Sequence, residues 1–389
     1  MSSNSPQPAA MTPAPAKPFF VKGLAGVVAA QTAISHVDGP NSTLIYRGIN
    51  VNDLVAQATY EEVAYLVLFG TLPSASQLAE FDAKLKANRD LPQAITAWLY
   101  SLPKETVPME VLRTAVSMMS HYEDDIQSIS IDSTIAKAIR LTAQLTTLCA
   151  AYLRIREGKA PIAPNVDLSH SANMLYMING QVPGKDLEAA MSAYFVLLAD
   201  HGLNASTFTA RVIASTQADL HSSISGALAA LKGPLHGGAN EATMNTLLEI
   251  GEPDNVDPWV DNAFATKRLI MGFGHRVYKN GDPRARVLTH LADEVGRKVG
   301  MDKYAKMSHM VEKAVQRHRE LYPNVDFYSA SLLYCLGIPI DLFTPMFACS
   351  RIIGWSAHVI EQYKDSVLIR PAAEYVGRLG DSFVAIENR

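Results

Sequence analysis

The chain has 389 residues, of which 48% are hydrophobic, and this is enough for a large buried core. Its 34 basic and 38 acidic side chains nearly balance and give a formal net charge of -4. No basic excess is available to hold nucleic acid or an anionic membrane surface, so the composition argues against both partners. Any anionic ligand must therefore meet locally placed arginines, lysines or helix N-termini.

The chain ends and the cysteines give two further expectations. The first sixteen residues are mostly Pro, Ala and Ser without a charged side chain, so residues 1–18 are predicted to be a disordered tail and not a signal peptide or mitochondrial presequence. Cys149, Cys335 and Cys349 are too few and too scattered for a disulfide framework or a zinc cluster. We expect them to be buried thiols in a protein of the reducing cytoplasm. The most apolar helical stretch, residues 189–199, is too short to cross a membrane.

Helix signals dominate the chain after a glycine-containing, irregular stretch over residues 19–50. Thr59 and Glu62 form a capping box ahead of an apolar run that ends near Gly70. Ser74 and Gln77 repeat this capping box before the next helix. Further helices are predicted over roughly residues 109–121, 133–156, 168–180, 186–200, 204–217 and 220–232.

Strand signals are nearly absent, since only residues 366–370 and parts of 27–48 show period-two alternation. The predicted fold class is therefore all-α. Loops become richer in Gly and Pro after about residue 232. This shift predicts a large helical domain over residues 19–236 and 332–389, and a small helical domain over residues 237–331.

The first candidate for chemistry is His236, in the stretch Gly-Pro-Leu-His-Gly-Gly-Ala-Asn-Glu. It follows a proline turn and precedes a predicted helix. A helix N-terminus disfavours a cationic imidazole, so His236 is expected to be neutral and able to donate one N–H. A neutral histidine can stabilise a developing enolate in this way. The alternative is a loop histidine with a structural hydrogen bond.

The second candidate is the stretch Gly-Phe-Gly-His-Arg-Val-Tyr-Lys-Asn-Gly-Asp-Pro-Arg, which places His275, Arg276, Lys279 and Arg284 within thirteen residues. Arginine suits a carboxylate and lysine a phosphate, so this cluster indicates an anionic ligand. A solvated basic loop is the alternative. The glycine spacing is not a dinucleotide fingerprint, because no strand precedes it and the third glycine is missing.

The third candidate is Asp326, which stands between apolar residues at a predicted helix start in Asn-Val-Asp-Phe-Tyr-Ser. Partial burial would raise its pKa from about 4 and make it a general base. The alternative is an N-cap. Arg351, at the head of a predicted helical run, and Arg370, before Pro371, could bind an anion or form surface ion pairs.

Together these stretches resemble the citrate synthase family in its shorter, prokaryotic form, and the resemblance runs from about residue 19 to the C-terminus. It rests mainly on GPLHGGANE, GFGHRVYKNGDPRA and NVDFYS in this order, and also on ADHGLNAST. It implies a helical fold in which the small domain closes over the substrates.

The resemblance also implies residue roles. Asp326 would remove a methyl proton from acetyl-CoA, His236 would bind the thioester oxygen as the enol forms, and His275 would polarise and protonate the oxaloacetate carbonyl. The other implied roles are binding of oxaloacetate by His201, Arg284, Arg351 and Arg370, and contacts of Arg276 and Lys279 with CoA. Arg370 would come from the neighbouring subunit, so a homodimer is the implied minimum unit.

The implied reaction gives citrate and CoA at the entry to the tricarboxylic acid cycle, without a cofactor or metal. One alternative is 2-methylcitrate synthase, which uses propionyl-CoA; one extra methylene changes selectivity by only about 1–3 kcal/mol. Another is a catalytically silent helical scaffold. ATP-dependent citrate cleavage is disfavoured because the motifs include no nucleotide-binding module.

Overall fold

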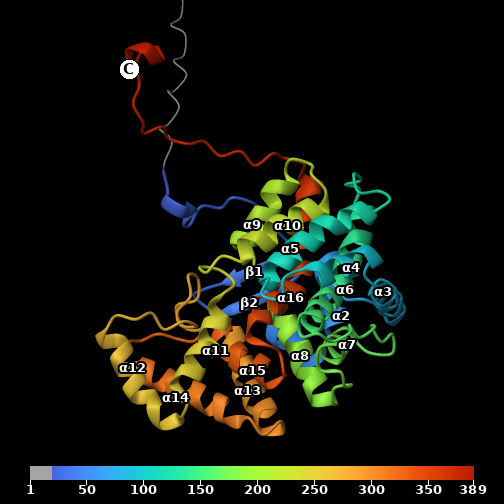
Figure 1. Ribbon diagram of the computed structural model, residues 1–389, viewed down its shortest axis with the longest axis vertical. Coiled ribbons are helices and arrows are strands. Elements are labelled where there is room, and N and C mark those ends of the chain that lie inside the picture. The colour runs from blue at the N-terminus through green and yellow to red at the C-terminus, as the bar shows by residue number, and fades with distance from the viewer. Residues whose placement is uncertain (1–19) are drawn as a thin grey trace, which may run out of the picture. The chain divides into compact units, whose positions relative to one another are not determined.

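The computed structural model describes residues 20–389 (Figure 1). The predicted tail over residues 1–18 lies outside the described residues and stays a prediction. Residues 32–369 form one compact unit, and the described residues of the two chain ends, 20–31 and 370–389, belong to another. In the described residues of the chain ends, regular structure consists of the 3₁₀ turns η1 (Lys22–Leu24) and η5 (Ile386–Asn388).

The unit over residues 32–369 is built from sixteen α-helices, three short strands and three 3₁₀ turns, which confirms the predicted all-α class. The first half contains β1 (Ser35–Asp38), β2 (Thr43–Tyr46), β3 (Ile49–Asn50), α1 (Val51–Gln57), α2 (Tyr60–Phe69), α3 (Ala75–Ala87), α4 (Gln93–Ser101), α5 (Pro108–Met119), η2 (Ser120–Tyr122), α6 (Ile131–Arg156), α7 (His170–Asn179) and α8 (Lys185–Leu198). The second half contains α9 (Ala205–Ala214), α10 (Leu220–Leu231), α11 (Ala239–Ile250), η3 (Pro253–Asn255), α12 (Val256–Ala265), α13 (Pro283–Lys298), α14 (Asp302–His318), α15 (Val325–Cys335), η4 (Ile340–Leu342) and α16 (Phe343–Asp365).

The two predicted capping boxes are present. The Thr59 side chain accepts a hydrogen bond from Glu62 N, and the Glu62 carboxylate accepts one from Thr59 N at 2.7 Å. Ser74 and Gln77 make the same reciprocal pair at the start of α3. Each pair satisfies backbone N–H groups that have no partner within the helix, which explains why both helices begin where they do.

The strand predictions had mixed outcomes. Strands β1, β2 and β3 form a small antiparallel sheet in that order, partly within the predicted window over residues 27–48. The prediction of a strand over residues 366–370 was wrong, since these residues have no regular structure. Side chains bind this backbone in place of a strand partner: Ile369 N donates to Ser215 Oγ at 3.1 Å, and Gln362 Nε2 donates to Val367 O at 2.9 Å.

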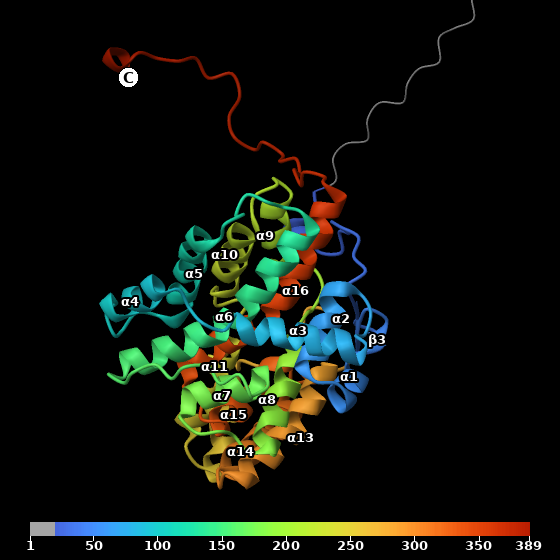
Figure 2. The ribbon, with the colours of Figure 1, turned by 90° about the vertical axis from the view of Figure 1, so that its right-hand side faces the viewer.

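Helices α6 and α16 form the centre of the unit over residues 32–369 (Figure 2). Both are buried over most of their length, and Cys149 Sγ on α6 lies 3.5 Å from Cys349 Sγ on α16. All three cysteines are buried and free, as predicted for the thiols. The α9–α10 pair packs against α16, and α5 packs against α10. No helix within residues 20–389 is long and apolar enough to cross a lipid bilayer.

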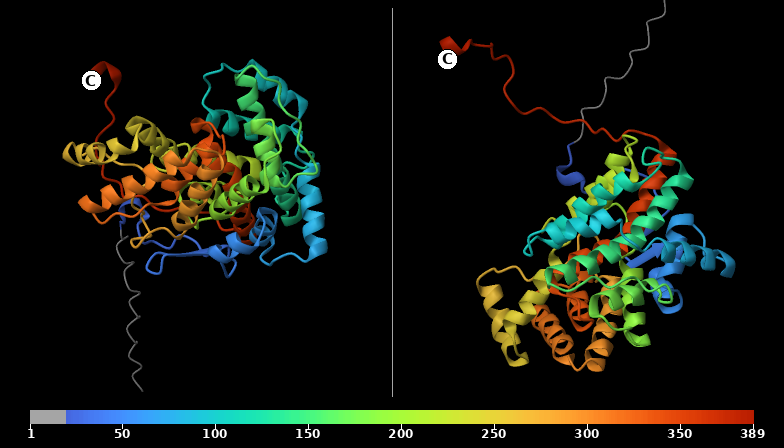
Figure 3. Two further views of the ribbon diagram at one scale, coloured as in Figure 1. Left: turned by 90° about the horizontal axis from the view of Figure 1, so that it is seen from below. Right: turned by 45° about the vertical axis from the view of Figure 1, so that its right-hand side comes forward.

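Helices α11 to α15 gather at one end of the same unit and remain together in two further views (Figure 3). Helix α13 packs against α14 and α15, α12 packs against α14, and α11 packs against α15. This group spans most of the predicted small domain over residues 237–331. Its independence from a large domain over residues 19–236 and 332–389 stays a prediction.

Candidate active site

One pocket of about 510 Å³ contains most of the residues selected from the sequence. Its walls come from the turn before α9, the turn between α10 and α11, the loop before α13, the starts of α13 and α15, and α16. The selected residues in its lining are His201, His236, His275, Arg276, Arg284, Asp326 and Arg351.

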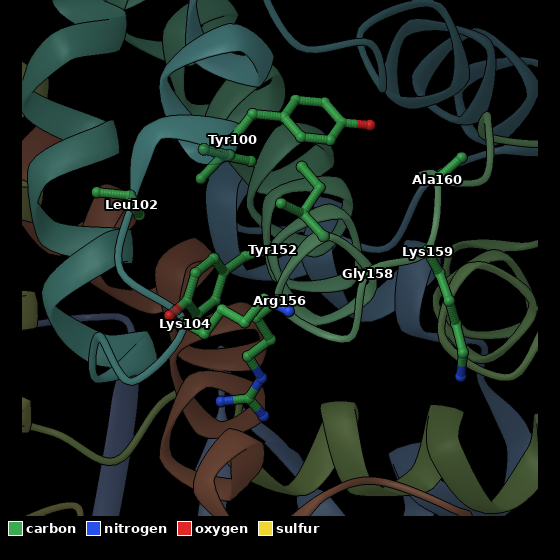
Figure 4. A pocket seen from close by; sticks show the side chains of 10 residues that line it. Tyr100, Leu102, Lys104, Tyr152, Arg156, Gly158, Lys159 and Ala160 are labelled. Atoms are coloured by element: carbon green, nitrogen blue, oxygen red, sulfur yellow. The ribbon is translucent and has the colours of Figure 1, made fainter.

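A second pocket, of about 380 Å³, lies beside the connection from α4 to α5 and the C-terminal end of α6 (Figure 4). Tyr100, Tyr152, Lys104, Arg156 and Lys159 contribute to its lining. The lining has no histidine or carboxylate, so it lacks the groups that most often transfer protons near neutral pH. Acid–base chemistry therefore fits the first pocket better.

The loop before α13 and the start of α15 are bound to each other. Gly274 N donates to Tyr322 O at 2.9 Å, and Asn324 N donates to Gly272 O at 2.9 Å. The Asn324 side chain also donates to Gly274 O at 2.9 Å. These bonds bring the loop of His275 next to Asp326, although fifty residues separate them in the chain.

His275 has a defined tautomer. Its Nδ1 accepts hydrogen bonds from Val277 N at 3.0 Å and Tyr278 N at 3.1 Å, so the ring proton of the neutral imidazole lies on Nε2. Burial lowers the pKa of His275 to about 4, and the charge of Arg284 acts in the same direction. His275 is therefore a neutral hydrogen-bond donor at neutral pH.

His236 precedes α11, which begins at Ala239, as predicted. Its Nε2 lies 2.8 Å from Ser206 Oγ, and this hydroxyl also accepts a hydrogen bond from Trp355 Nε1 at 3.1 Å. Burial and then the charge of Arg351 lower the pKa of His236 to about 4, so the ring is neutral at neutral pH. Ser206 Oγ has one proton and lies 2.8 Å from both His236 Nε2 and Asn204 Oδ1, so the ring proton of His236 is on Nδ1 when Ser206 donates to Nε2 and on Nε2 when it donates to Asn204.

Asp326 is the second residue of α15, and the N-cap is Asn324, whose side chain accepts from Asp326 N at 3.0 Å. The N-cap alternative for Asp326 was therefore wrong. Its Oδ1 is buried and has no hydrogen-bond partner among residues 20–389. Burial, with a smaller contribution from Asp282, raises the pKa of Asp326 to about 7. This value suits a general base that works near neutral pH.

Arg284 is held by Asp282, a residue that the sequence analysis did not select. Arg284 Nη2 donates to Asp282 Oδ2 at 2.7 Å, and Nε donates to Oδ1 at 3.0 Å. The same carboxylate accepts from Val325 N at 3.2 Å and so connects the starts of α13 and α15. A buried ion pair of this geometry fixes the direction of the guanidinium.

Arg351 lies in the middle of α16 and not at the head of a helix, because α16 already begins at Phe343. Its Nε donates to Leu198 O at 2.6 Å, whereas its Nη2 is buried without a hydrogen-bond partner among residues 20–389. A buried, unsatisfied guanidinium nitrogen in a pocket wall indicates a site for an anionic ligand.

His201 closes the pocket wall next to His275, with the two ring centroids 5.3 Å apart. Its Nε2 lies 3.3 Å from Tyr278 Oη. Burial, and then the charges of Arg284 and Arg351, hold the pKa of His201 well below its usual range. His201 is therefore also a neutral imidazole.

The remaining selected residues are placed less closely. Arg276 is exposed at the edge of the pocket, and Lys279 is exposed with its Nζ donating to His275 O at 3.0 Å. Arg370 belongs to the unit of the chain ends and is not placed relative to the pocket. In the part of the chain from residue 20 onward, no three His, Cys, Asp or Glu side chains are grouped to hold a metal ion.

Comparison with known proteins identifies the family. The family model "Citrate synthase, C-terminal domain" matches residues 23–372. "Citrate synthase 2" of Bacillus subtilis is 44% identical over 95% of this chain and 99% of its own length. "2-methylcitrate synthase 2" of Corynebacterium glutamicum is 41% identical over 95% and 97%.

Solved structures agree with this. The citrate synthase of Thermotoga maritima matches with a TM-score of 0.85 and 42% identity over 95% of this chain and 99% of that chain. A ternary complex of the Thermoplasma acidophilum citrate synthase with carboxymethyl coenzyme A and oxaloacetate matches with a TM-score of 0.89 and 32% identity, covering 94% and 98%. The chain belongs to the citrate synthase family and is an acyltransferase enzyme.

The raised pKa of Asp326 predicts a gain in stability when the carboxyl is replaced. A folded pKa of about 7, above the unfolded value of about 4, means that the folded protein loses stability as the pH rises between these values. Asp326→Asn has no charge to bury, so its free energy of unfolding at pH 8 should exceed that of the wild type by about 2–4 kcal/mol. Thermal or urea unfolding at pH 8 and pH 5 measures this.

The difference between Asp326→Asn and wild type should shrink at pH 5, where the folded wild type carries the proton. Asp302→Asn, a surface carboxylate paired with Lys306, is the control and should show no such gain. A variant that is less stable than the wild type at pH 8 would contradict the burial of an ionised carboxylate.

Proposed function

We propose that the chain is a citrate synthase that condenses acetyl-CoA with oxaloacetate and water, giving citrate and CoA. The single observation that supports this best is the buried, unpartnered Oδ1 of Asp326 in one pocket with three neutral histidines and two buried arginines. A thioester methyl is a weak acid, so its deprotonation needs a base and a stabilised enolate in the same dry site.

In the proposed first step, Asp326 takes a proton from the methyl group of acetyl-CoA. His236 donates from Nδ1 to the thioester oxygen while the enol forms, and Ser206 supports this when its hydroxyl proton turns from Asn204 Oδ1 to Nε2. A neutral imidazole is suitable here because an imidazolium near Arg351 would be disfavoured by like charge. One such donor in a water-excluded site contributes about 3–4 kcal/mol.

In the proposed second step, the enol carbon attacks the ketone carbon of oxaloacetate. His275 donates from Nε2 to the ketone oxygen and protonates the alkoxide as the carbon–carbon bond forms, and the proton that Asp326 took from the methyl group then restores the neutral His275 ring. His201, Arg284 and Arg351 bind the oxaloacetate oxygens, and Arg276 and Lys279 contact CoA. Water then hydrolyses the citryl thioester and releases CoA. These steps need no cofactor or metal, because the protein groups supply both the base and the donors.

The proposed active unit is a homodimer in which Arg370 of each chain reaches the site of the other. The C-terminal segment, residues 370–389, exposes several large apolar side chains: Tyr375, Val376, Leu379, Phe383 and Ile386. Such a group of exposed apolar side chains favours another protein surface as its partner. The mass of the native particle tests this. With its reduced, buried cysteines the enzyme is proposed to be cytoplasmic and to act at the entry to the tricarboxylic acid cycle.

The acyl group is the finer part of this proposal, because relatives at similar identity carry both names, citrate synthase and 2-methylcitrate synthase. We expect thiol release from acetyl-CoA plus oxaloacetate, with a higher kcat/KM for acetyl-CoA than for propionyl-CoA. Parallel assays of free thiol with each acyl-CoA measure this. A preference for propionyl-CoA would replace the proposal by 2-methylcitrate synthase, and no release with either would favour a silent scaffold.

A further inference from the structure

The turn that carries His201 is held by the buried carboxylate of Asp200. Asp200 has no exposed surface, and its Oδ2 accepts hydrogen bonds from Gly202 N at 3.0 Å and from Ser35 Oγ. Ser35 Oγ also accepts from Gly202 N at 3.0 Å. Gly202 has a φ of +58°, a left-handed conformation that glycine adopts readily because it has no Cβ. The peptide that follows His201 is thus fixed by two side chains.

His358, on α16, contacts the carboxylate of Asp200. Its Nε2 lies 3.3 Å from Asp200 Oδ1 and 3.4 Å from Oδ2, and its Nδ1 lies 3.2 Å from Arg211 Nη1. A guanidinium can only donate, so Nδ1 of His358 must accept. The proton of the ring therefore lies on Nε2 and is donated to Asp200.

At the end of this network that is farther from His201, Arg211 pairs with an acidic side chain. Arg211 Nη1 donates to Glu361 Oε2 at 2.6 Å, and Arg211 Nε donates to Gln362 Oε1 at 3.1 Å. Burial by itself would raise the pKa of Asp200, at the other end of the network. The interaction with His358, the charge of Arg351 and the Ser35 hydrogen bond outweigh burial and lower the pKa to about 2. Asp200 therefore stays ionised and keeps accepting.

Helix α16 contacts the same turn through its backbone. A Cβ atom on Gly354 would lie 2.3 Å from Ala199 O and 2.6 Å from Asp200 Oδ1, so only glycine permits this approach. Arg351, Gly354 and His358 are spaced three and four residues apart and so share one face of α16. This face binds the turn of His201 and also presents Arg351 to the pocket.

We propose that Asp200 and His358 are positioning residues, which hold the turn of His201 so that its ring stays in the wall of the oxaloacetate site. This inference rests on the proposed function. A network that served only to stabilise the fold would change the unfolding temperature without a selective effect on one substrate. A positioning network changes KM for oxaloacetate while kcat and KM for acetyl-CoA change much less.

Two substitutions at His358 separate its contacts. His358→Gln places an amide N–H near the position of Nε2 and can still donate to Asp200. His358→Asn reaches only the position of Nδ1, so it keeps the contact with Arg211 and loses the donor to Asp200. We expect KM for oxaloacetate to rise about tenfold in His358→Asn and to stay within about twofold of wild type in His358→Gln. Equal KM values in the two variants would overturn the proposal.

Ser35→Ala is the second test, since Ser35 is only partly buried and its loss removes a donor to Asp200 without opening the core. It should raise KM for oxaloacetate by about threefold. The neighbouring His36→Ala, whose side chain is 68% exposed, is the control and should not change it. An unchanged KM in Ser35→Ala would also overturn the proposal, including when His358→Asn does not fold.

Calorimetric titration of the wild type and each variant with oxaloacetate alone distinguishes failure of the positioning role from failure of the proposed function. Binding by the wild type with about tenfold weaker binding by His358→Asn supports both. Binding of equal strength by the wild type and both His358 variants overturns only the positioning role. No binding by the wild type overturns the proposed function, and the positioning role with it.

Discussion

Asp326→Asn is expected to lower kcat with acetyl-CoA and oxaloacetate by about 10³-fold, because the amide cannot accept the methyl proton. The substitution keeps the size of the side chain, so the start of α15 and the Asn324 cap should be retained. A steady-state assay of thiol release, with both substrates saturating, measures the change. Binding of oxaloacetate should be nearly unaffected, since the arginines and histidines of the pocket remain.

Two controls define this result. Asp326→Ala should be at least as impaired as Asp326→Asn, and the surface variant Asp302→Asn should keep wild-type kcat. Because Asp326→Asn is also expected to be more stable than the wild type at pH 8, unfolding cannot explain its lost activity. Wild-type kcat in Asp326→Asn would show that another group removes the proton.

The pH dependence of kcat/KM gives the same base an independent signature. The free enzyme should lose activity as the pH falls below about 7, since protonated Asp326 cannot act as a base. The histidines of the pocket stay neutral over this range, because burial lowers the pKa of His236 and His275 to about 4.

The sequence predicted the fold class and most of the pocket for identifiable reasons. Capping boxes at Thr59 and Ser74 and helical periodicity depend on neighbouring residues, and these local signals are strong. His236, His275 and Asp326 were found because each stands in a short, distinctive stretch of chain. His275 and Asp326 lie in one pocket because hydrogen bonds join the His275 loop to the Asn324 segment, and His236 joins them through its contact with Ser206.

The residues that support the site were missed because their partners are distant in the chain. Asp200 meets His358 across 158 residues, and Ser206 meets His236 across 30. No local pattern distinguishes these side chains from ordinary polar residues. The strand expected over residues 366–370 was wrong for a related reason, since side chains from α16 and the end of α9 bind that backbone.

Removal of the His236 ring is the second substitution that is expected to lower kcat strongly. His236→Ala should lower kcat by about 10²–10³-fold, the usual cost of losing one donor to a developing oxyanion. Because this donor acts mainly as the enol forms, kcat and kcat/KM should fall together while KM for acetyl-CoA changes little. Steady-state assays with varied acetyl-CoA at saturating oxaloacetate measure both constants.

His236→Asn is the informative partner variant, since its amide can reach the position of Nδ1 and donate there without the contact to Ser206. It should retain more activity than His236→Ala. His121→Ala, at an exposed histidine of η2 that is not part of the pocket lining, should behave as wild type. A rise in KM for acetyl-CoA with unchanged kcat in His236→Ala would mean that His236 binds the thioester equally before and during enol formation, and the enol-stabilising role would then be wrong.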